Sequence, residues 1–464
     1  MNWTLLRKTP RRFGMVNNIN IKCQVCGSVT RVRLQIGYLK HHPIVVPCYK
    51  CGISLCGEVV IGQDSPSLKY NFENADIDNK SDSDYIVECS GEFPVNKICE
   101  DNISNYNLIT PFIRISSTLK DDKREGYFNS IASLNMTTEK WNITKRIFDL
   151  FQTRSPYLTQ EIKKEYKGPL FSCNNEAEIL RSVHNIEILS FYMPLRQDIL
   201  KNIKFSEDIL RINPVQMKAL VNFLNSHDGY QLEKIQAQIY SIQDKFIKVY
   251  PSLIPAICLQ YIGEDNFDYE KVGSSTSTFD SIKEFYIDVY ETLCNLLIIP
   301  VAFDNIKYRD NYNQLSCITV KNACSLEDFI NLSKADRIKY CNISENKGIH
   351  ISYLKSLFNS KLRNAVGHND YEYNSISQEI TYYPDPKNRS RQYKEYLLEC
   401  ENEAVHMFQG ILAVSEFLYR LRELKMMHDG NASMIECMSK KINVYDLCPC
   451  GSGKKHKFCH KKSV

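Results

Sequence analysis

Two groups of cysteines, one near each end of the chain, constrain the fold more than any other feature. Near the N-terminus the sequence contains two C-x2-C pairs, Cys23/Cys26 and Cys48/Cys51. Each pair can present two thiolates from one tight turn, and four thiolates complete the tetrahedral shell that Zn²⁺ takes in structural sites. Such a site leaves no open coordination position. The spacing therefore predicts a small module that folds around one structural zinc ion.

The residues between the two pairs predict β structure, because apolar and polar side chains alternate there as in half-buried strands. A glycine, Gly27 or Gly52, follows the second cysteine of each pair, where a tight turn needs positive φ. Residues 19–62 resemble a zinc ribbon. A site with four thiolates has no vacancy for three further candidate ligands nearby. These are His41, His42 and Cys56.

The C-terminal group has a different spacing, within the run DLCPCGSGKKHKFCHKKSV at residues 446–464. Three thiolates and one imidazole suit a second structural zinc ion. Its candidate ligands are Cys448, Cys450, Cys459 and His460. The run lacks the spacing and the final Ser or Thr of a phosphate-binding P-loop.

This tail resembles the SEC-C motif, which lies at the carboxyl end of the SecA translocation ATPase and is appended to many bacterial proteins. The resemblance implies a zinc knuckle over residues 444–464 that docks onto a protein or the ribosome. Several lysines in the tail favour an acidic partner. The tail therefore indicates recruitment rather than catalysis.

Composition indicates a soluble protein. The chain has 464 residues, of which 43% are apolar and 24% charged, and its net charge of +4 excludes a uniformly basic nucleic-acid-binding coat. The N-terminus lacks a signal-peptide pattern, and the most apolar run, residues 293–303, is too short to span a bilayer. Of the eighteen cysteines, those outside the two metal-ligand groups lie singly in apolar contexts. We expect a reduced, cytoplasmic protein with no membrane partner.

The spacing of apolar residues predicts a mainly α (α+β) protein. Residues 63–116 are expected to form a linker with short strands, because residues 65–84 are polar and acidic. Residues 117–279 predict helices to which the sequence assigns no role. One apolar seam there, over residues 232–249, is expected to end at Pro251 and to pack within a helical bundle.

Residues 280–430 predict a helical bundle with one β-hairpin. An apolar helix is expected over residues 285–299, and a long helix is expected to end at Gly430. Between these helices, the tyrosine-rich residues 371–383 alternate as in a hairpin.

A helix predicted over residues 351–366 carries the candidate active site. Gly367 is expected to end this helix as the residue after its C-cap. Arg363, Asn364 and His368 then place a permanent cation, an amide and an imidazole within little more than one helical turn. Such a set suits metal-free RNA cleavage. The imidazole can move the proton of a ribose 2′-hydroxyl, and the guanidinium can bind the phosphate and stabilise its added charge.

This run, on a helical bundle of this size, resembles the HEPN superfamily, whose ribonucleases carry an R-x4-6-H motif. The resemblance implies that Arg363 and His368 are catalytic and that Asn364 supports them. It further implies a homodimer in which two motifs face each other, and cleavage that leaves a cyclic phosphate. A second match, Arg422 to His428, lies among apolar residues at the end of the long helix and is not expected to act.

The sequence thus predicts a metal-independent endoribonuclease of a bacterial toxin or antiphage type, recruited by two zinc modules. The alternative is a non-catalytic RNA- or protein-binding zinc adaptor. In that alternative Arg363 pairs with a carboxylate and His368 caps its helix end. Zinc-dependent catalysis is disfavoured, because both predicted zinc sites already have four protein ligands.

Overall fold

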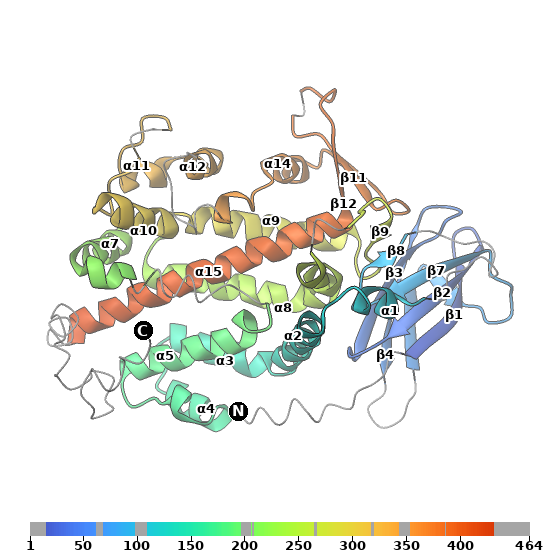
Figure 1. The fold of residues 1–464 in the computed structure, drawn as a ribbon, viewed down its shortest axis with the longest axis horizontal. Helices are drawn as coiled ribbons and strands as arrows, with labels where there is room; N and C mark the ends of the chain where they lie inside the picture. Colours follow the sequence, from blue (N-terminus) through green and yellow to red (C-terminus); the bar gives the residue numbers. More distant parts are fainter. Residues whose placement is uncertain are drawn as a thin grey trace.

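The computed structural model describes residues 15–61, 68–97, 109–195, 206, 208–263, 267–316, 320–342, 353–385 and 387–430. In this part the chain is mainly helical with small sheets, as the sequence predicts. Figure 1 shows a strand-rich N-terminal module at one end of a helical body. The second predicted zinc site, with Cys448, Cys450, Cys459 and His460, lies outside the described residues, so it stays a prediction.

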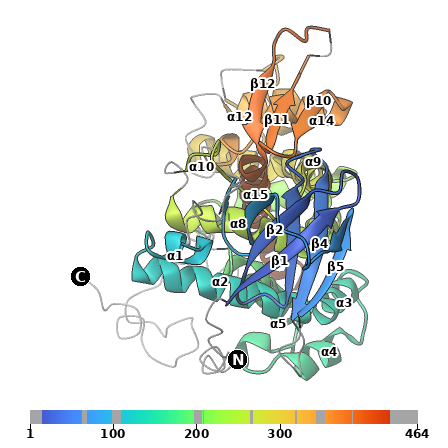
Figure 2. The same cartoon turned by 90° about the vertical axis from the view of Figure 1, so that its right-hand side faces the viewer.

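The N-terminal module consists of two small sheets that enclose one apolar core, seen from the front in Figure 2. One sheet has the order β6-β1-β2-β7, with β2 and β7 parallel, and the other has the antiparallel order β3-β4-β5. The strands are β1 (Met15–Cys23), β2 (Val29–Ile36), β3 (His41–Pro47), β4 (Ser54–Ile61), β5 (Leu68–Glu73), β6 (Ala75–Ile77) and β7 (Tyr85–Ser90).

Strands β5 and β6 lie where the sequence predicts a linker. In β5 the apolar Leu68, Tyr70 and Phe72 alternate with exposed polar residues, and all three pack against the core of the module. The average polarity of the stretch conceals this alternation, because only one face of an edge strand needs to be apolar. The acidic stretch therefore contributes two strands to the module.

The helical body is built around the long helix α15 (Leu397–Gly430), which packs between α8 (Leu232–Ile262) and α9 (Phe279–Leu296). The other α-helices are α1 (Pro111–Ser116), α2 (Asp121–Glu139), α3 (Trp141–Gln152), α4 (Leu158–Glu165), α5 (Glu176–Glu187), α7 (Pro214–Ser226), α10 (Ile298–Arg309), α11 (Leu326–Asn331), α12 (Lys334–Cys341) and α14 (Ser360–His368). A 3₁₀ turn (Pro169–Phe171) precedes α5, and a π-helical turn (Ile188–Tyr192) follows it.

Short strands connect the two parts of the molecule. Strand β8 (Val95–Asn96) pairs with β9 (Val272–Gly273). A second sheet contains β10 (Tyr371–Asn374), β11 (Glu379–Tyr382) and β12 (Tyr393–Tyr396), all antiparallel. The predicted hairpin is thus confirmed as β10 and β11, and β12 adds a third strand that the sequence did not predict.

Aromatic side chains fill the centre of the body. Phe246 of α8 and Phe408 of α15 stack with ring centroids 4.1 Å apart, and Phe285 of α9 lies 6.4 Å from Phe408. At Gly410 of α15, an added Cβ would meet the Cδ1 atom of Leu357 at 2.9 Å, so a larger residue there would require neighbouring leucine side chains to shift. The segment 117–279 therefore shares one continuous core with the segment 280–430.

Helix α8 is longer than predicted. It continues through Pro251 and Pro255 to Ile262, so the expected end of the seam at Pro251 is wrong. Each proline removes a backbone hydrogen bond within the helix. Burial of the residues around them compensates for this loss, because Leu253, Ile254 and most of the following turn have no exposed surface.

One helical stretch in the described part, Phe279–Arg309, is long and apolar enough to cross a membrane by length and composition. Of its most apolar window, 72% is buried inside the protein. Most of this window therefore packs in the core of the helical body.

Asp244 ties α8 to α3. Its carboxylate accepts a hydrogen bond from Trp141 Nε1 at 2.8 Å and lies 2.9 Å from Lys145 Nζ and 3.0 Å from Lys248 Nζ. Burial alone would raise the pKa of Asp244, but these donors lower it to about 2. Because this pKa lies below the unfolded value, the ionised carboxylate stabilises the fold above about pH 4, and that contribution is lost as the pH falls through 2.

Asp244→Asn is therefore expected to lower the free energy of unfolding at pH 7 by about 1.5–3 kcal/mol, the usual contribution of a hydrogen bond to a charged group. The difference from wild type should narrow as the pH falls from 4 towards 2. Urea unfolding followed by circular dichroism measures both effects. Asp149→Asn, at an exposed position of α3, serves as the matched control. An equal loss of unfolding free energy in Asp244→Asn and Asp149→Asn would show that the Asp244 carboxylate makes no special contribution.

Candidate metal centre and candidate catalytic helix

Two similar turns present the cysteines of the N-terminal module. In the turn from β1 to β2, the Gly27 amide donates to the Cys23 carbonyl at 2.9 Å. In the turn from β3 to β4, the Gly52 amide donates to the Cys48 carbonyl at 2.7 Å. Both glycines have positive φ, 72° and 79°. The sequence prediction for these two positions is thus confirmed, and each turn places its pair of thiols on one side.

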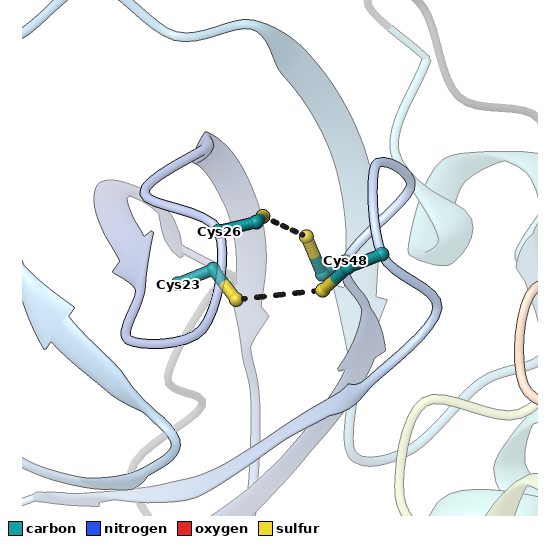
Figure 3. Close-up of side chains that lie close together, drawn as sticks. Cys23, Cys26 and Cys48 are labelled. Atoms are coloured by element: carbon teal, nitrogen blue, oxygen red, sulfur yellow. Dashed lines mark hydrogen bonds between the residues drawn. The ribbon is translucent and has the colours of Figure 1, made fainter.

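The four thiols of Cys23, Cys26, Cys48 and Cys51 converge on one point, with their sulfur atoms within 4.8 Å of one another (Figure 3). Cys23 Sγ lies 3.7 Å from Cys51 Sγ, and Cys26 Sγ lies 3.5 Å from Cys48 Sγ. A disulfide requires ~2 Å. A zinc ion with Zn–S bonds of about 2.3 Å separates its thiolates by roughly 3.8 Å in a tetrahedron. The cluster therefore fits a metal ion such as zinc, consistent with a zinc ribbon.

Local contacts favour the thiolate form of one ligand. A hydrogen bond from the backbone of Ser28 lowers the pKa of the Cys26 thiol to about 7, whereas burial raises the pKa of Cys48 to about 12. A bound zinc ion deprotonates its coordinating thiols. Four thiolates would fill its coordination shell, so the ion would serve the fold.

The three neighbouring candidates lie outside this group. Among the described residues, the four cysteines form the one cluster with metal-ligand geometry. His42 is fully buried, and this burial lowers its pKa to about 4. His41 Nδ1 faces Glu58 at 3.5 Å, and Cys56 pairs across the strands with Val45. Their assignment as bystanders agrees with this geometry.

The second cysteine turn contacts the helical body. Ser375, in the turn between β10 and β11, donates a hydrogen bond from its hydroxyl to the Gly52 carbonyl. The Tyr49 hydroxyl, within the same cysteine turn, donates to the Lys97 carbonyl. Lys97 Nζ in turn donates to the Ser377 carbonyl at 2.5 Å. The candidate metal centre thus supports the hairpin that begins three residues after His368.

Helix α14, which carries the candidate catalytic residues, is shorter than predicted. It begins at Ser360, whereas the sequence predicts one helix over residues 351–366. Asn359 interrupts that helix as an N-cap, with φ of −93° and ψ of 81°, and its side chain accepts from the Leu362 amide at 3.1 Å. Residues 353–355 are also helical, but residues 356–359 are not, so they separate this segment from α14.

Gly367 does not end α14, so this prediction is wrong. The helix continues through His368, and Asn369 takes the left-handed conformation with φ of 55°. The Asn369 amide closes the helix by donating to the carbonyls of Ala365 and Val366. Asparagine tolerates this conformation better than most residues, which is why it replaces the expected glycine there.

Two buried acids hold Asn359 in place. Its side-chain amide donates to Glu395 Oε2 at 3.0 Å and to Glu403 Oε1 at 3.3 Å. Burial raises the pKa of both carboxyls, that of Glu403 to about 7. The start of α14 is thereby fixed to β12 and α15.

Asn359→Ala is expected to lower the free energy of unfolding by about 1–2 kcal/mol, because it removes the helix cap and one donor to two buried carboxyls. The shift of the urea midpoint measures this loss. Asn342→Ala, at an exposed position after α12, is the control and should change the midpoint little. A midpoint for Asn359→Ala that equals the control would show that the cap contributes nothing.

Arg363 is held by a carboxylate of α9. Its Nη2 lies 2.5 Å and its Nε 2.7 Å from Glu291 Oε1, and 31% of its side chain is exposed. Lys334, at the start of α12, pairs with the other oxygen of Glu291. Burial and the nearby Arg363 guanidinium lower the pKa of Lys334. One carboxylate therefore serves two cations at the side of α14.

Asn364 and His368 occupy another face of the same helix. They are four positions apart, so they lie on one side of α14, and both are exposed. Arg363 precedes them by one and five positions, which places it roughly 100–140° around the helix at 3.6 residues per turn. Its Nη1 lies 3.4 Å from Asn364 Oδ1. The three residues are neighbours on one helix, but Arg363 turns towards α9 and His368 towards solvent.

Glu291 and Lys334 form an ion-pair cluster with Arg363 that the sequence does not predict. Glu291 lies 72 positions from Arg363, so no local pattern links them. Glu291 is one of four acidic residues of α9, so the sequence of this helix does not single it out either. The second R-x4-6-H match stays consistent with packing, because the Arg422 guanidinium lies over the Phe151 ring at 4.7 Å.

Comparison of the chain with protein-family models, with curated proteins and with solved structures found no match. The candidate metal centre and the arrangement of α14 therefore carry the functional argument on their own.

Proposed function

We propose that this protein is a metal-independent endoribonuclease of the HEPN type, with zinc modules that recruit its target or partner. The observation that supports the proposal most is the position of His368 and Asn364 on one exposed face of α14, with Arg363 on the neighbouring face that turns towards α9. An imidazole, an amide and a guanidinium on nine residues of rigid helix are the groups that RNA cleavage without metal requires.

In the proposed reaction, His368 accepts the proton of a ribose 2′-hydroxyl while the 2′-oxygen attacks the adjacent phosphorus. The bond from phosphorus to the 5′-oxygen breaks, and the departing 5′-oxygen takes up a proton from water. The products are a 2′,3′-cyclic phosphate and a 5′-hydroxyl end. Asn364 would hydrogen-bond the sugar or phosphate, and Arg363 would bind the phosphate oxygens.

Arg363 must exchange partners in this scheme. Its guanidinium is bound to Glu291, so an incoming phosphate has to displace that carboxylate. Lys334 remains as a counter-ion for Glu291, which lowers the cost of releasing Arg363. A second copy of the chain would supply the facing motif, so we propose a homodimer as the active form.

The two zinc modules are proposed to act in recruitment. The N-terminal cluster would hold its ion with Cys23, Cys26, Cys48 and Cys51. The C-terminal knuckle, of the SEC-C type, would hold a second ion and dock onto a protein or the ribosome. A cytoplasmic toxin or antiphage effector fits this combination of a catalytic body and two small docking modules.

A second candidate, a non-catalytic RNA- or protein-binding zinc adaptor, is favoured by one observation. The Arg363–Glu291 ion pair satisfies the guanidinium within the fold, as a purely structural arginine would be. Incubation of the purified protein with single-stranded RNA separates the two. Cleavage that leaves cyclic phosphate ends supports the enzyme, whereas binding of RNA without cleavage supports the adaptor.

A further inference from the structure

The exposed face of α14 that carries His368 also carries a second cation. Lys361, Asn364 and His368 are all exposed, and their spacing of three and four positions places them within roughly 60° around the helix. Arg363 lies about 160° from Lys361 on this wheel. The cation that shares a face with His368 is therefore Lys361 rather than Arg363.

Lys361 rests on an aromatic ring. Its Nζ lies 3.9 Å from the ring centroid of Tyr393, the first residue of β12. No carboxylate of the described residues forms an ion pair with Lys361, in contrast to Arg363 on Glu291. An ammonium held by a ring at an exposed site is held weakly, so it can turn to a phosphate at little cost.

Tyr393 packs in a row of tyrosines on the sheet. It pairs with Tyr382 across the sheet, their rings lie 5.8 Å apart with an interplanar angle of 24°, and Tyr371 continues the row on β10. Tyr382 is buried, whereas Tyr393 remains partly exposed. When Lys361 turns to a phosphate, the ring face that its ammonium covers is left for a nucleobase to stack on.

We propose that Lys361 and Tyr393 form a nucleotide subsite for unpaired RNA, next to the proposed cleavage site. The Lys361 ammonium would bind a backbone phosphate, and the Tyr393 ring would stack on a base. Lys361 and His368 are seven positions apart, about 10 Å along the helix. Bases in a duplex are already stacked and paired, so the subsite selects single strands.

This inference rests on the proposed RNA substrate, and binding to RNA that cannot be cleaved tests it separately from catalysis. The probe is a short 2′-O-methylated single strand, and the comparison is the same strand annealed to its complement. Fluorescence anisotropy with the full-length protein should show tighter binding of the single strand. Tyr393→Leu should weaken that binding by roughly 5- to 150-fold, the range for loss of one stacked base, whereas Tyr393→Phe should bind as wild type does.

Lys361→Ala tests the proposed phosphate contact without disturbing the core, because the Lys361 side chain is exposed. It should weaken single-strand binding and reduce the slope of log K against log salt by about 0.7, the value for one lost phosphate contact. Tyr157→Leu is the matched control, since Tyr157 is 68% exposed on another part of the body. Thermal melting checks the fold of every variant.

Any one of three results would contradict the proposed subsite. They are equal affinity for single strand and duplex, affinities of Tyr393→Leu and Lys361→Ala that match the Tyr157→Leu control, and no RNA binding at all. If the expected dependences are found but unmodified RNA is not cleaved, the catalytic proposal fails and the subsite stands.

Discussion

Cys48→Ser is expected to release the metal from the N-terminal module and to unfold its two sheets. The serine hydroxyl is a far poorer zinc ligand than a thiolate, and Cys48 Sγ is fully enclosed between the two cysteine turns. The module has only a small apolar core of its own. We expect the loss of a large part of the ~10–16 kcal/mol with which structural zinc ions bind small domains.

Metal content by elemental mass spectrometry and hydrogen exchange of β1 to β4 measure this outcome. The exchange protection of β10 and β11 should fall as well, because Gly52 accepts the hydrogen bond from Ser375 at their turn. Cys56→Ser is the matched control, since Cys56 lies on β4 outside the cluster. Unchanged metal content and unchanged exchange in Cys48→Ser would show that the four cysteines hold no structural ion.

His368→Ala is expected to reduce RNA cleavage by about 10²- to 10⁴-fold, the usual contribution of a general acid–base group. The fold should be retained, because His368 is exposed at the last turn of α14. Single-turnover cleavage of a labelled single strand measures the rate. His41→Ala, at an exposed histidine of β3, is the control for loss of an imidazole elsewhere.

Arg363 gives a less direct test than His368. Its removal would also leave Glu291 with Lys334 as its remaining partner, so fold and chemistry would change together. His368→Ala separates the effect on the chemistry from the effect on the fold. A rate for His368→Ala equal to that of His41→Ala would exclude His368 from the chemistry and leave the zinc adaptor as the better description.

The cysteine cluster of the candidate metal centre was predictable from the sequence because its candidate ligands are local. Each C-x2-C pair lies in one tight turn, and the glycine after it reports the positive φ of that turn. The hairpin at 371–383 was predictable for the same reason, since alternation of side chains is a local signal. In contrast, the sequence predicts a linker where β5 lies, because the average polarity of the segment hides the single apolar face of this edge strand.

Contacts between distant segments could not be predicted. The continuation of α8 through Pro251 depends on burial against α15, which outweighs the local cost of proline. The early start of α14 depends on Asn359, whose amide is held by two buried glutamates of β12 and α15.

A buried ion cluster is another contact between distant segments that the sequence does not predict. His184 of α5 lies 2.8 Å from Glu416 of α15, 232 positions away, and stacks on Tyr419 at 3.9 Å. Burial alone would lower the pKa of His184, but hydrogen bonds with Glu187 and Glu416 outweigh it and raise the pKa to about 9. No periodicity of either helix indicates this pairing.

We propose that zinc serves the fold while residues of α14 cleave RNA without metal. The most direct measurement incubates the wild-type protein with single-stranded RNA in EDTA, follows zinc content in the same sample, and identifies the new RNA ends. We predict that cleavage persists while zinc is retained, and that the fragments carry 2′,3′-cyclic phosphate and 5′-hydroxyl ends. Intact RNA, or fragments with 5′-phosphate ends, would contradict this account.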